Sequence, residues 1–272
     1  MKKILALILA LVMMLSLVAC GNEPNNDDDA TGNNDGNVVN NDNDNDNVDA
    51  DTDDEVEDVT VMSYDEYIAA AIDTPVVVET YVQAKQSWWE DKATVYSQDE
   101  DGAYFLYNMA CSAEDYEKLT VGTKIRVTGY KSEWSGEVEI VDATFEILDG
   151  NFVATPEDVT ALLGTDDLIK HQNEFGSFKG MTVEASQDAD GNDVAFLYNW
   201  DGSGQDGSDL YFKVSLNGET YTFTVESYLC DNTTEVYSAV KALNIGDKID
   251  MEGFLYWYEG VNPHITSVSA AN

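Results

Sequence analysis

Basic residues are scarce in this chain. It carries 13 Lys plus Arg against 53 Asp plus Glu, a formal net charge of −40 over 272 residues. From residue 60 onward the balance is still 11 basic against 38 acidic residues. Nucleic-acid backbones are held by clustered Lys and Arg, so this balance disfavours nucleic acid and favours neutral or cationic partners.

Catalytic signatures are also missing. The chain has two histidines, His171 and His264, one arginine, Arg126, and no G-x-S-x-G, H-E-x-x-H, C-x-x-C or Walker pattern. Staphylococcal-type nucleases need more than one catalytic arginine, which this chain does not supply. The Asp-rich segment from Asp188 fails the EF-hand pattern and is typical of a hairpin turn. We therefore expect no enzyme activity, no cofactor and no defined metal site, and leave a weak calcium site open.

What the sequence does contain begins with its first twenty residues. Two lysines precede an apolar run, residues 4–15, that is too short to span a bilayer and has the length of a signal-peptide core. Leu17-Val18-Ala19-Cys20 then resembles the lipobox of bacterial lipoproteins. The resemblance implies removal of residues 1–19, lipidation of Cys20, and anchoring on the extracytoplasmic face of the cell membrane. An ordinary secreted protein is the alternative.

The segment that follows, residues 21–59, consists almost entirely of Asn, Asp, Gly and Glu. It holds fifteen acidic residues and no basic one. Such a composition cannot form a core, so we predict that residues 20–59 are the lipidated Cys and a disordered tether. With Cys20 lipidated, Cys111 and Cys230 remain. A disulfide is permitted outside the cytoplasm, but buried free thiols are favoured because the two cysteines fall in separate domains.

A repeat organises the rest of the chain. At a shift of 124 residues, L-T-V-G-T-K-I-R-V-T-G-Y at residues 119–130 aligns without a gap to L-N-I-G-D-K-I-D-M-E-G-F at residues 243–254. Each block is preceded by strand and hairpin patterns and a capped helix, and is followed by another strand. This order argues for a duplicated domain.

In each copy the predicted order is three strands, a short helix and two strands, which is the order of the OB-fold, a five-stranded barrel. In the first copy we expect a helix at 64–71, strands at 76–85, 92–97, 104–109, 124–131 and 137–147, and a helix from Ser112. In the second we expect helices at 156 and 167–175, a first strand at 181–185 and 194–199 interrupted by a turn, strands at 210–216 and 221–225, and a helix at 235–243 before the last two strands. An SH3-like or other small barrel is the competing interpretation.

The predicted fold is mainly β: two tandem five-stranded OB-fold-like barrels after the acidic tether. The expected boundaries are 60–149 for the first domain, 150–178 for a helical linker and 179–272 for the second domain. The whole resembles uncharacterised Gram-positive surface lipoproteins that carry OB-like domains, a family that implies no reaction.

The aromatic residues gather in the connections that form OB-fold ligand sites. All five Trp lie in the loops between the first and second or between the fourth and fifth predicted strands. The candidate ligand-binding residues are Trp88, Trp89, Trp134, Trp200, Tyr256, Trp257 and Tyr258. Exposed rings stack on sugars, bases or cations, whereas the alternative is that they close the barrel ends as a small core.

The sequence thus favours a membrane-anchored binding protein without turnover, whose aromatic loops recognise carbohydrate or protein. The alternative from fold analogy is a nucleic-acid-binding OB-fold protein or a nuclease-like enzyme. A purely structural spacer is the third hypothesis.

Overall fold

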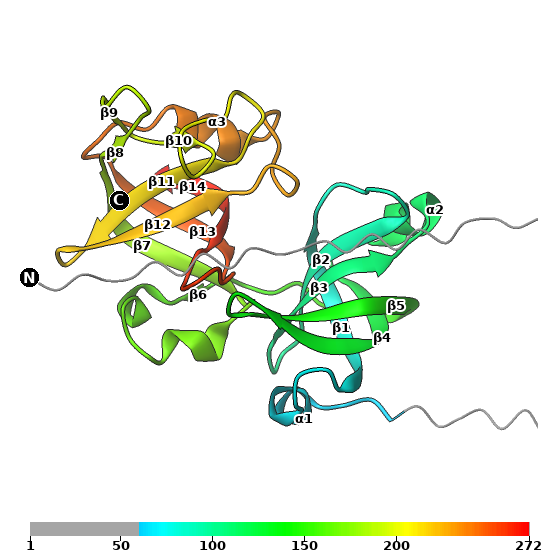
Figure 1. Cartoon of the computed structure of the whole chain (residues 1–272). Coiled ribbons are helices and arrows are strands. Elements are labelled where there is room, and N and C mark those ends of the chain that lie inside the picture. Colours follow the sequence, from blue (N-terminus) through cyan, green and yellow to red (C-terminus); the bar gives the residue numbers. More distant parts are fainter. Residues whose placement is uncertain (1–59, 272) are drawn as a thin grey trace, which may run out of the picture. The chain divides into compact units, whose positions relative to one another are not determined.

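The first barrel is a closed five-stranded sheet. The computed structural model describes residues 60–271, and in it the strands are ordered β1-β2-β3-β5-β4, with β4 pairing back to β1 (Figure 1). The strands are β1 Pro75–Lys85, β2 Lys92–Gln98, β3 Ala103–Ala110, β4 Thr123–Trp134 and β5 Glu137–Asn151. Two helices belong to this barrel, α1 Tyr64–Ala69 and α2 Ala113–Lys118.

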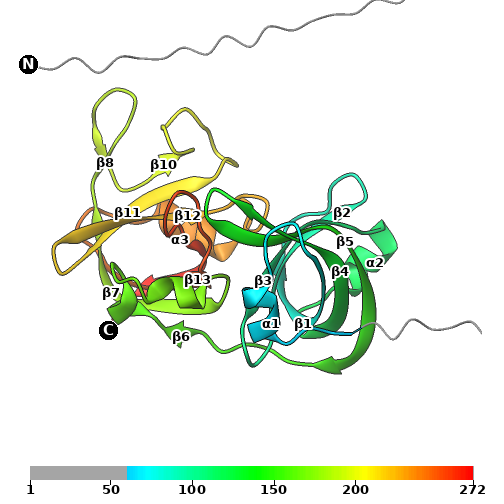
Figure 2. The ribbon, with the colours of Figure 1, turned by 60° about the horizontal axis from the view of Figure 1, so that its bottom comes forward.

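The second barrel repeats this arrangement. Its strands are β7 Phe175–Glu184, β11 Leu210–Leu216, β12 Glu219–Val225, β13 Lys248–Phe254 and β14 His264–Ala270, with helix α3 Glu235–Lys241 between β12 and β13. They are ordered β11-β12-β14-β13-β7, and β11 pairs with β7 to close the barrel. Figure 2 shows the short strands β8 Ser186–Gln187 and β10 Leu197–Tyr198 beside this barrel; β9 Asp193–Val194 pairs with β8.

Both barrels therefore have the predicted OB-fold-like order. In each, the third strand runs parallel to the fifth, through Phe105 opposite Glu139 and Thr224 opposite His264. A short helix joins the third and fourth strands, and its start is capped by Ser112 or Thr234, whose hydroxyl accepts a backbone N–H. The prediction of two five-stranded barrels is confirmed.

The repeated glycines explain why the two sequences kept one pattern. Gly122 and Gly246 both adopt positive φ, 89° and 92°, and both donate their N–H to the strand that opens the barrel, at Val82 and Val183. At Gly129 and Gly253 the fifth strand crosses so closely that an added Cβ would lie 2.8 Å and 2.3 Å from its backbone oxygens. Any larger residue would force the two strands apart at both places.

The inward-facing residues form one core per barrel. In the first, alternate residues of β1 such as Val76 and Val78 pack with Ile125 and Val127 of β4. Arg126, between the latter two, points outward as expected and pairs with Glu79 at 2.8 Å. Cys111 and Cys230 are buried and free, which confirms the expected thiols, and burial raises the pKa of each to about 11.

The connection between the barrels differs from the predicted α-helices. It contains the two-residue strand β6 Glu157–Asp158 and two short 3-10 helices, η1 Thr160–Leu162 and η2 Leu168–His171. β6 pairs with β7, and β7 itself begins at Phe175, within the segment expected to be linker. Val159 is fully buried in the second core, so tertiary packing overrides the local helix signals from Pro156 and Asp167.

The Asp-rich turns are hairpin turns, as expected. Asp99 Oδ1 accepts the N–H groups of Asp101 and Gly102, and Asp188 Oδ1 accepts those of Asp190 and Asn192. The predicted signal, Cys20 and the tether lie outside the described residues. No helix within residues 60–271 has the length and apolar character needed to cross a membrane.

A third hydrophobic cluster joins the two barrels. Tyr96 and Phe105 of the first barrel and Phe254 of the second are each at most 3% exposed, and the Tyr96 and Phe254 rings stack with centroids 4.6 Å apart. Tyr96 Oη also lies 2.6 Å from His264 Nδ1. Residues 60–271 are accordingly one compact body in which the barrels share a core.

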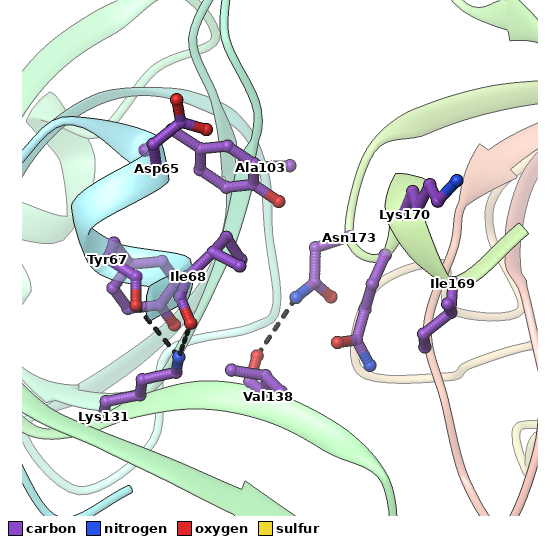
Figure 3. Close-up of a pocket in the computed structure, with 11 residues that line it drawn as sticks. Asp65, Tyr67, Ile68, Ala103, Lys131, Val138, Ile169, Lys170 and Asn173 are labelled. Carbon is purple, nitrogen blue, oxygen red and sulfur yellow. Dashed lines mark hydrogen bonds between the residues drawn. The ribbon is translucent and has the colours of Figure 1, made fainter. Parts of the chain in front are cut away.

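A buried lysine ends helix α1. The Lys131 ammonium donates to the carbonyl oxygens of Tyr67 and Ile68 (Figure 3) and to that of Ala70, at 2.8–2.9 Å. The residue is only 5% exposed. Burial lowers the pKa of this amine. Tyr67 O also accepts the Ala70 N–H at 3.2 Å, whereas Ile68 O and Ala70 O accept no backbone N–H from the described residues. The cation therefore completes the C-terminus of α1 and fixes it to β4.

Replacing Lys131 should remove the contact that holds the C-terminus of α1 on β4. We expect Lys131→Met to lower the free energy of unfolding by about 2 kcal/mol, because three carbonyls lose a charged donor while the side-chain length is kept. Urea denaturation measures this. Lys179→Met, at an exposed position, is the matched control and should change stability by less than about 0.5 kcal/mol. Equal stabilities of the two variants would contradict the assigned role.

Candidate functional site

An aromatic cleft lies where the two barrels meet. It has a volume of about 570 Å³, and its walls come from the β4–β5 turn, the β13–β14 loop, strand β11 and the loop before it. We call it the aromatic cleft and define it by its lining residues, which are Trp134, Trp200, Tyr211, Tyr256, Tyr258, Glu259, Asn262 and His264. Four of the seven residues predicted from the sequence are among them.

The wall from the first barrel is set by a tight turn. Ser135 and Gly136 both have positive φ, so Trp134 and Glu137 face each other at the end of the β4–β5 hairpin. The Trp134 ring packs against Tyr258 of the second barrel with centroids 5.1 Å apart, and Ser135 O accepts the Glu259 N–H at 2.7 Å. Rings from both barrels thus form one surface.

The wall from the second barrel is a loop held by its own backbone. Asn262 N donates to Tyr256 O and Tyr258 N donates to Gly260 O, which folds residues 256–262 back on themselves. The Tyr256 ring stacks on His264 with centroids 4.2 Å apart. Trp200, in the loop before β11, follows Asn199, which has φ 57°, and the residue is 76% exposed.

The polar groups of the cleft are few. Asn262 Oδ1 accepts the Thr224 hydroxyl, which leaves the amide N–H groups of Asn262 without a partner among the described residues. His264 is neutral at pH 7, because burial lowers its pKa to about 3. When Tyr96 donates to Nδ1 of His264, the ring proton sits on Nε2 and offers a donor at the cleft wall. Glu259 supplies acceptors.

The field in the cleft is negative. Among the described residues that line it, one is a carboxylate and none is Lys or Arg. Burial raises the pKa of Tyr211, and the carboxylates of Asp209 and Glu226 raise it further. A phosphate group would meet repulsion here, whereas a neutral or cationic ring-bearing ligand would not.

A second groove lies where the loop after β1 and strands β2 and β3 meet Tyr228 of the second barrel. It measures about 420 Å³ and is lined by Gln86, Ser87, Trp89, Lys92, Thr94, Tyr107, Asn108 and Tyr228; we call it the strand groove. Trp89, Tyr107 and Tyr228 are each at least 44% exposed. Tyr107 and Tyr228 were not predicted from the sequence, since a Tyr at a strand position or before a helix carries no site pattern.

Rings connect the groove to the cleft. Tyr107 stacks on Phe105 at 6.3 Å, and Phe105 packs edge-on against Tyr256, a cleft residue, at 5.3 Å. Each site is built on the loop between the first and second strands of one barrel and on the outer face of that barrel's second strand. These are the β1–β2 loop and β2 for the strand groove, and the β7–β11 loop and β11 for the aromatic cleft. These are the parts of an OB-fold that bind oligonucleotides and oligosaccharides.

The other two predicted tryptophans have structural contacts. Trp88 Nε1 donates to Cys111 O at 2.9 Å, which fixes the ring to its own barrel. Trp257 is partly buried and packs on the core of the second barrel, as the core-closing alternative expects. Loop position alone therefore does not separate exposed rings from structural ones.

A buried carboxyl group holds the cleft walls together. Glu137 is fully buried, and its Oε2 accepts the Trp257 N–H at 2.8 Å and the Gln172 amide at 3.3 Å. Its Oε1 has no partner among the described residues. Burial raises the pKa of Glu137 to about 8, and also raises those of Glu139 and Glu226 to about 7.

Two further features lie outside the cleft. A pocket of about 400 Å³ between α1 and η2 is lined by Tyr67 and Asn173, and the buried oxygens Tyr67 Oη and Asn173 Oδ1 have no partner among the described residues (Figure 3). Within residues 60–271, one group of potential metal-ligand atoms converges closely enough to hold an ion; it consists of Glu157, His171 and Glu174. None of these residues lines the cleft.

No protein-family model matches the sequence, and no curated protein matches it. Solved structures similar to this chain include the Ifi202 HINa domain in complex with 20bp dsDNA, at 14% identity and a TM-score of 0.33, covering 75% of this chain and 98% of that one. A murine DNA-binding protein bound to dsDNA is similar at 12% identity and a TM-score of 0.32, covering 73% and 100%. A replication protein A heterotrimer bound to ssDNA is similar at 10% identity and a TM-score of 0.30, covering 73% and 49%.

The buried carboxyl predicts a pH dependence of stability. Between the usual Glu pKa of 4.5 and about 8, folded Glu137 holds a proton that the unfolded chain has lost, so stability falls as pH rises. His264 changes the stability in the opposite direction, but only below the usual His pKa of 6.5. There the unfolded chain binds a proton at this histidine and the folded chain does not. We therefore expect the free energy of unfolding to fall from pH 6.5 to 8.5.

Glu137→Gln should reduce this slope, most clearly between pH 7.5 and 8.5, because the pKa values of Glu139 and Glu226 are raised only to about 7. The amide keeps an acceptor for the Trp257 N–H and does not titrate. Urea denaturation at pH 6.5, 7.5 and 8.5 measures it. Glu133→Gln, at an exposed position on the same hairpin, should leave the slope unchanged. A slope in Glu137→Gln as steep as in the parent protein would refute the buried carboxyl as its source.

Proposed function

We propose that this protein is a lipid-anchored, extracytoplasmic binding protein that recognises carbohydrate chains in the aromatic cleft without turnover. The observation that carries the proposal is that exposed rings from both barrels converge on one cleft, and that none of its described lining residues is Lys or Arg. Aromatic faces stack on sugar rings, and the Asn262, His264 and Glu259 groups match the hydroxyls of a sugar.

The strand groove supports a ligand that is a chain. Its three exposed rings continue the ring contacts that begin in the cleft, so a linear oligosaccharide long enough to reach both would gain contacts with Trp89 and Tyr228 as well. Each added contact in a linked ligand raises affinity without a new association cost.

Binding without turnover is supported by the use of the carboxyl groups. The two buried carboxyl groups nearby accept backbone N–H groups: Glu137 Oε2 accepts that of Trp257, and the Glu226 oxygens accept those of Tyr228 and Leu229. Among the described residues, the one carboxylate that lines the cleft is Glu259. Glycoside hydrolysis needs two carboxyl groups at the substrate, so this arrangement favours binding alone.

A nucleic acid is the second candidate ligand. OB-fold topology and exposed rings suit stacked bases, and the solved structures reported above include proteins bound to DNA. The charge of this chain opposes it, since single-strand binding also needs a positive groove along the backbone. In the strand groove, Lys92 is the one basic residue among its described lining residues. A cationic peptide would suit the charge equally.

A titration separates these ligands. Tryptophan fluorescence of the protein should change on adding neutral cell-wall oligosaccharides and stay constant on adding single-stranded DNA at 50 mM and 200 mM salt. We expect Trp134→Ala and Trp200→Ala each to weaken oligosaccharide binding about tenfold, as for a central aromatic contact, while the free energy of unfolding changes by less than about 0.5 kcal/mol. Trp89→Ala should weaken only the longer oligosaccharides.

Trp257→Ala is the structural control. Because this ring packs on the core of the second barrel, its removal should cost about 3 kcal/mol of stability. DNA binding that falls steeply with salt would replace the carbohydrate proposal by the nucleic-acid one. No fluorescence change with either ligand, together with binding of a cationic peptide, would indicate a protein partner.

The anchor has its own test. Cys20→Ser should abolish incorporation of labelled palmitate by growing cells and move the protein from the detergent phase to the aqueous phase on Triton X-114 partition, because the acyl chains would no longer be attached. Cys230→Ser, whose native thiol is buried in the second barrel, should be labelled normally. Equal labelling of Cys20→Ser and the parent would overturn the lipoprotein assignment.

A further inference from the structure

Three side chains from separate elements converge in the connection between the barrels. Glu157 opens β6, His171 ends η2, and Glu174 immediately precedes β7. One potential ligand atom from each lies within 4.8 Å of the other two. The backbone fixes two of the positions: Glu157 pairs with Gly176 across β6 and β7, and Glu174 O accepts the Leu255 N–H at 3.0 Å.

The distances fit the edges of a coordination polyhedron. His171 Nδ1 lies 2.8 Å from Glu174 Oε2 and 3.7 Å from Glu157 Oε2. Zn²⁺ holds nitrogen and oxygen ligands at about 2.0–2.1 Å in a tetrahedron, which separates neighbouring ligand atoms by about 3.3 Å. The two separations from His171 lie on either side of this value, and the ligand atoms of Glu157 and Glu174 lie within 4.8 Å of each other, so an ion would draw the three groups together by small side-chain shifts.

The charges around the cluster are not balanced. Two carboxylates share one imidazole, and no described Lys or Arg pairs with either of them. The nearest lysine in sequence, Lys170, is paired with Asp167 at 2.6 Å. The Glu174 side chain is only 16% exposed. A divalent cation would neutralise the two carboxylates, whereas the contacts with the histidine offset their charge only in part.

We infer that Glu157, His171 and Glu174 form a binding site for a divalent transition-metal ion, with Zn²⁺ as the representative species. An imidazole nitrogen with two carboxylate oxygens suits Zn²⁺ and its neighbours, whereas Ca²⁺ prefers oxygen ligands alone. Three protein ligands leave a fourth position for water. The bound ion would tie η2 and β6 to the start of the second barrel. This site is independent of the proposed carbohydrate cleft.

The test is Zn²⁺-dependent thermal stability of the full chain. At a free Zn²⁺ concentration of about 100 times Kd, the melting temperature should rise by roughly 5–10 °C. Ca²⁺ at the same concentration should give little of this shift. His171→Ala should abolish the shift and weaken Zn²⁺ binding at least tenfold by calorimetry, since it removes the nitrogen ligand.

Matched variants decide the outcome. Asp166→Asn removes a carboxylate from the same connection but outside the cluster, and should respond to Zn²⁺ like the parent, which also controls for diffuse binding by other acidic residues. Glu157→Gln, at a side chain that is 63% exposed, should lose the response without loss of folding, so it keeps the test decisive if His171→Ala does not fold. No Zn²⁺ response in the parent, or an equal response in Glu157→Gln, would overturn the inference.

Discussion

A buried hydrogen bond from the Trp257 N–H to the Glu137 carboxyl ties the two walls of the cleft together. A fully buried carboxyl group needs donors, and Glu137 finds them outside its own barrel, in the Trp257 N–H of the second barrel and the Gln172 amide of the connection. The hydrogen bond also holds Trp134, which lies opposite Glu137 across the β4–β5 turn, against Tyr258. Neither barrel alone has the cleft, so a duplication of the domain created a surface that a single copy lacks.

The fold could be predicted because its requirements are local and occur twice. Gly122 and Gly246 satisfy the same positive φ, and Gly129 and Gly253 the same close strand crossing, so both copies had to keep the same residues. Alternating apolar residues and capping hydroxyls specify the strands and helices between them. The connection could not be predicted in this way, because Pro156 and Asp167 carry helix signals while the burial of Val159 and the pairing of β6 with β7 are tertiary effects.

The candidate site could be predicted only in part, for a similar reason. That the aromatic residues lie in the barrel loops follows from the strand order. Which rings face outward depends on contacts distant in sequence: Trp257 packs on a core, whereas Trp134 lies against Tyr258, 124 residues away. The partnership of Tyr96 with His264 spans 168 residues, and neither residue has a neighbouring motif that would reveal it.

The use of the basic residues explains the character of the surface. Lys131 completes α1, Lys124 and Arg126 share Glu79, and Lys241 pairs with Asp206. A cation held in such a contact is not free to displace the counterions of a phosphate chain without losing its partner. Within residues 60–271 most of the basic side chains are held in such contacts, so the described surface presents mainly rings and carboxylates to solvent. This surface is consistent with the proposed recognition of a neutral ligand by stacking and hydrogen bonding.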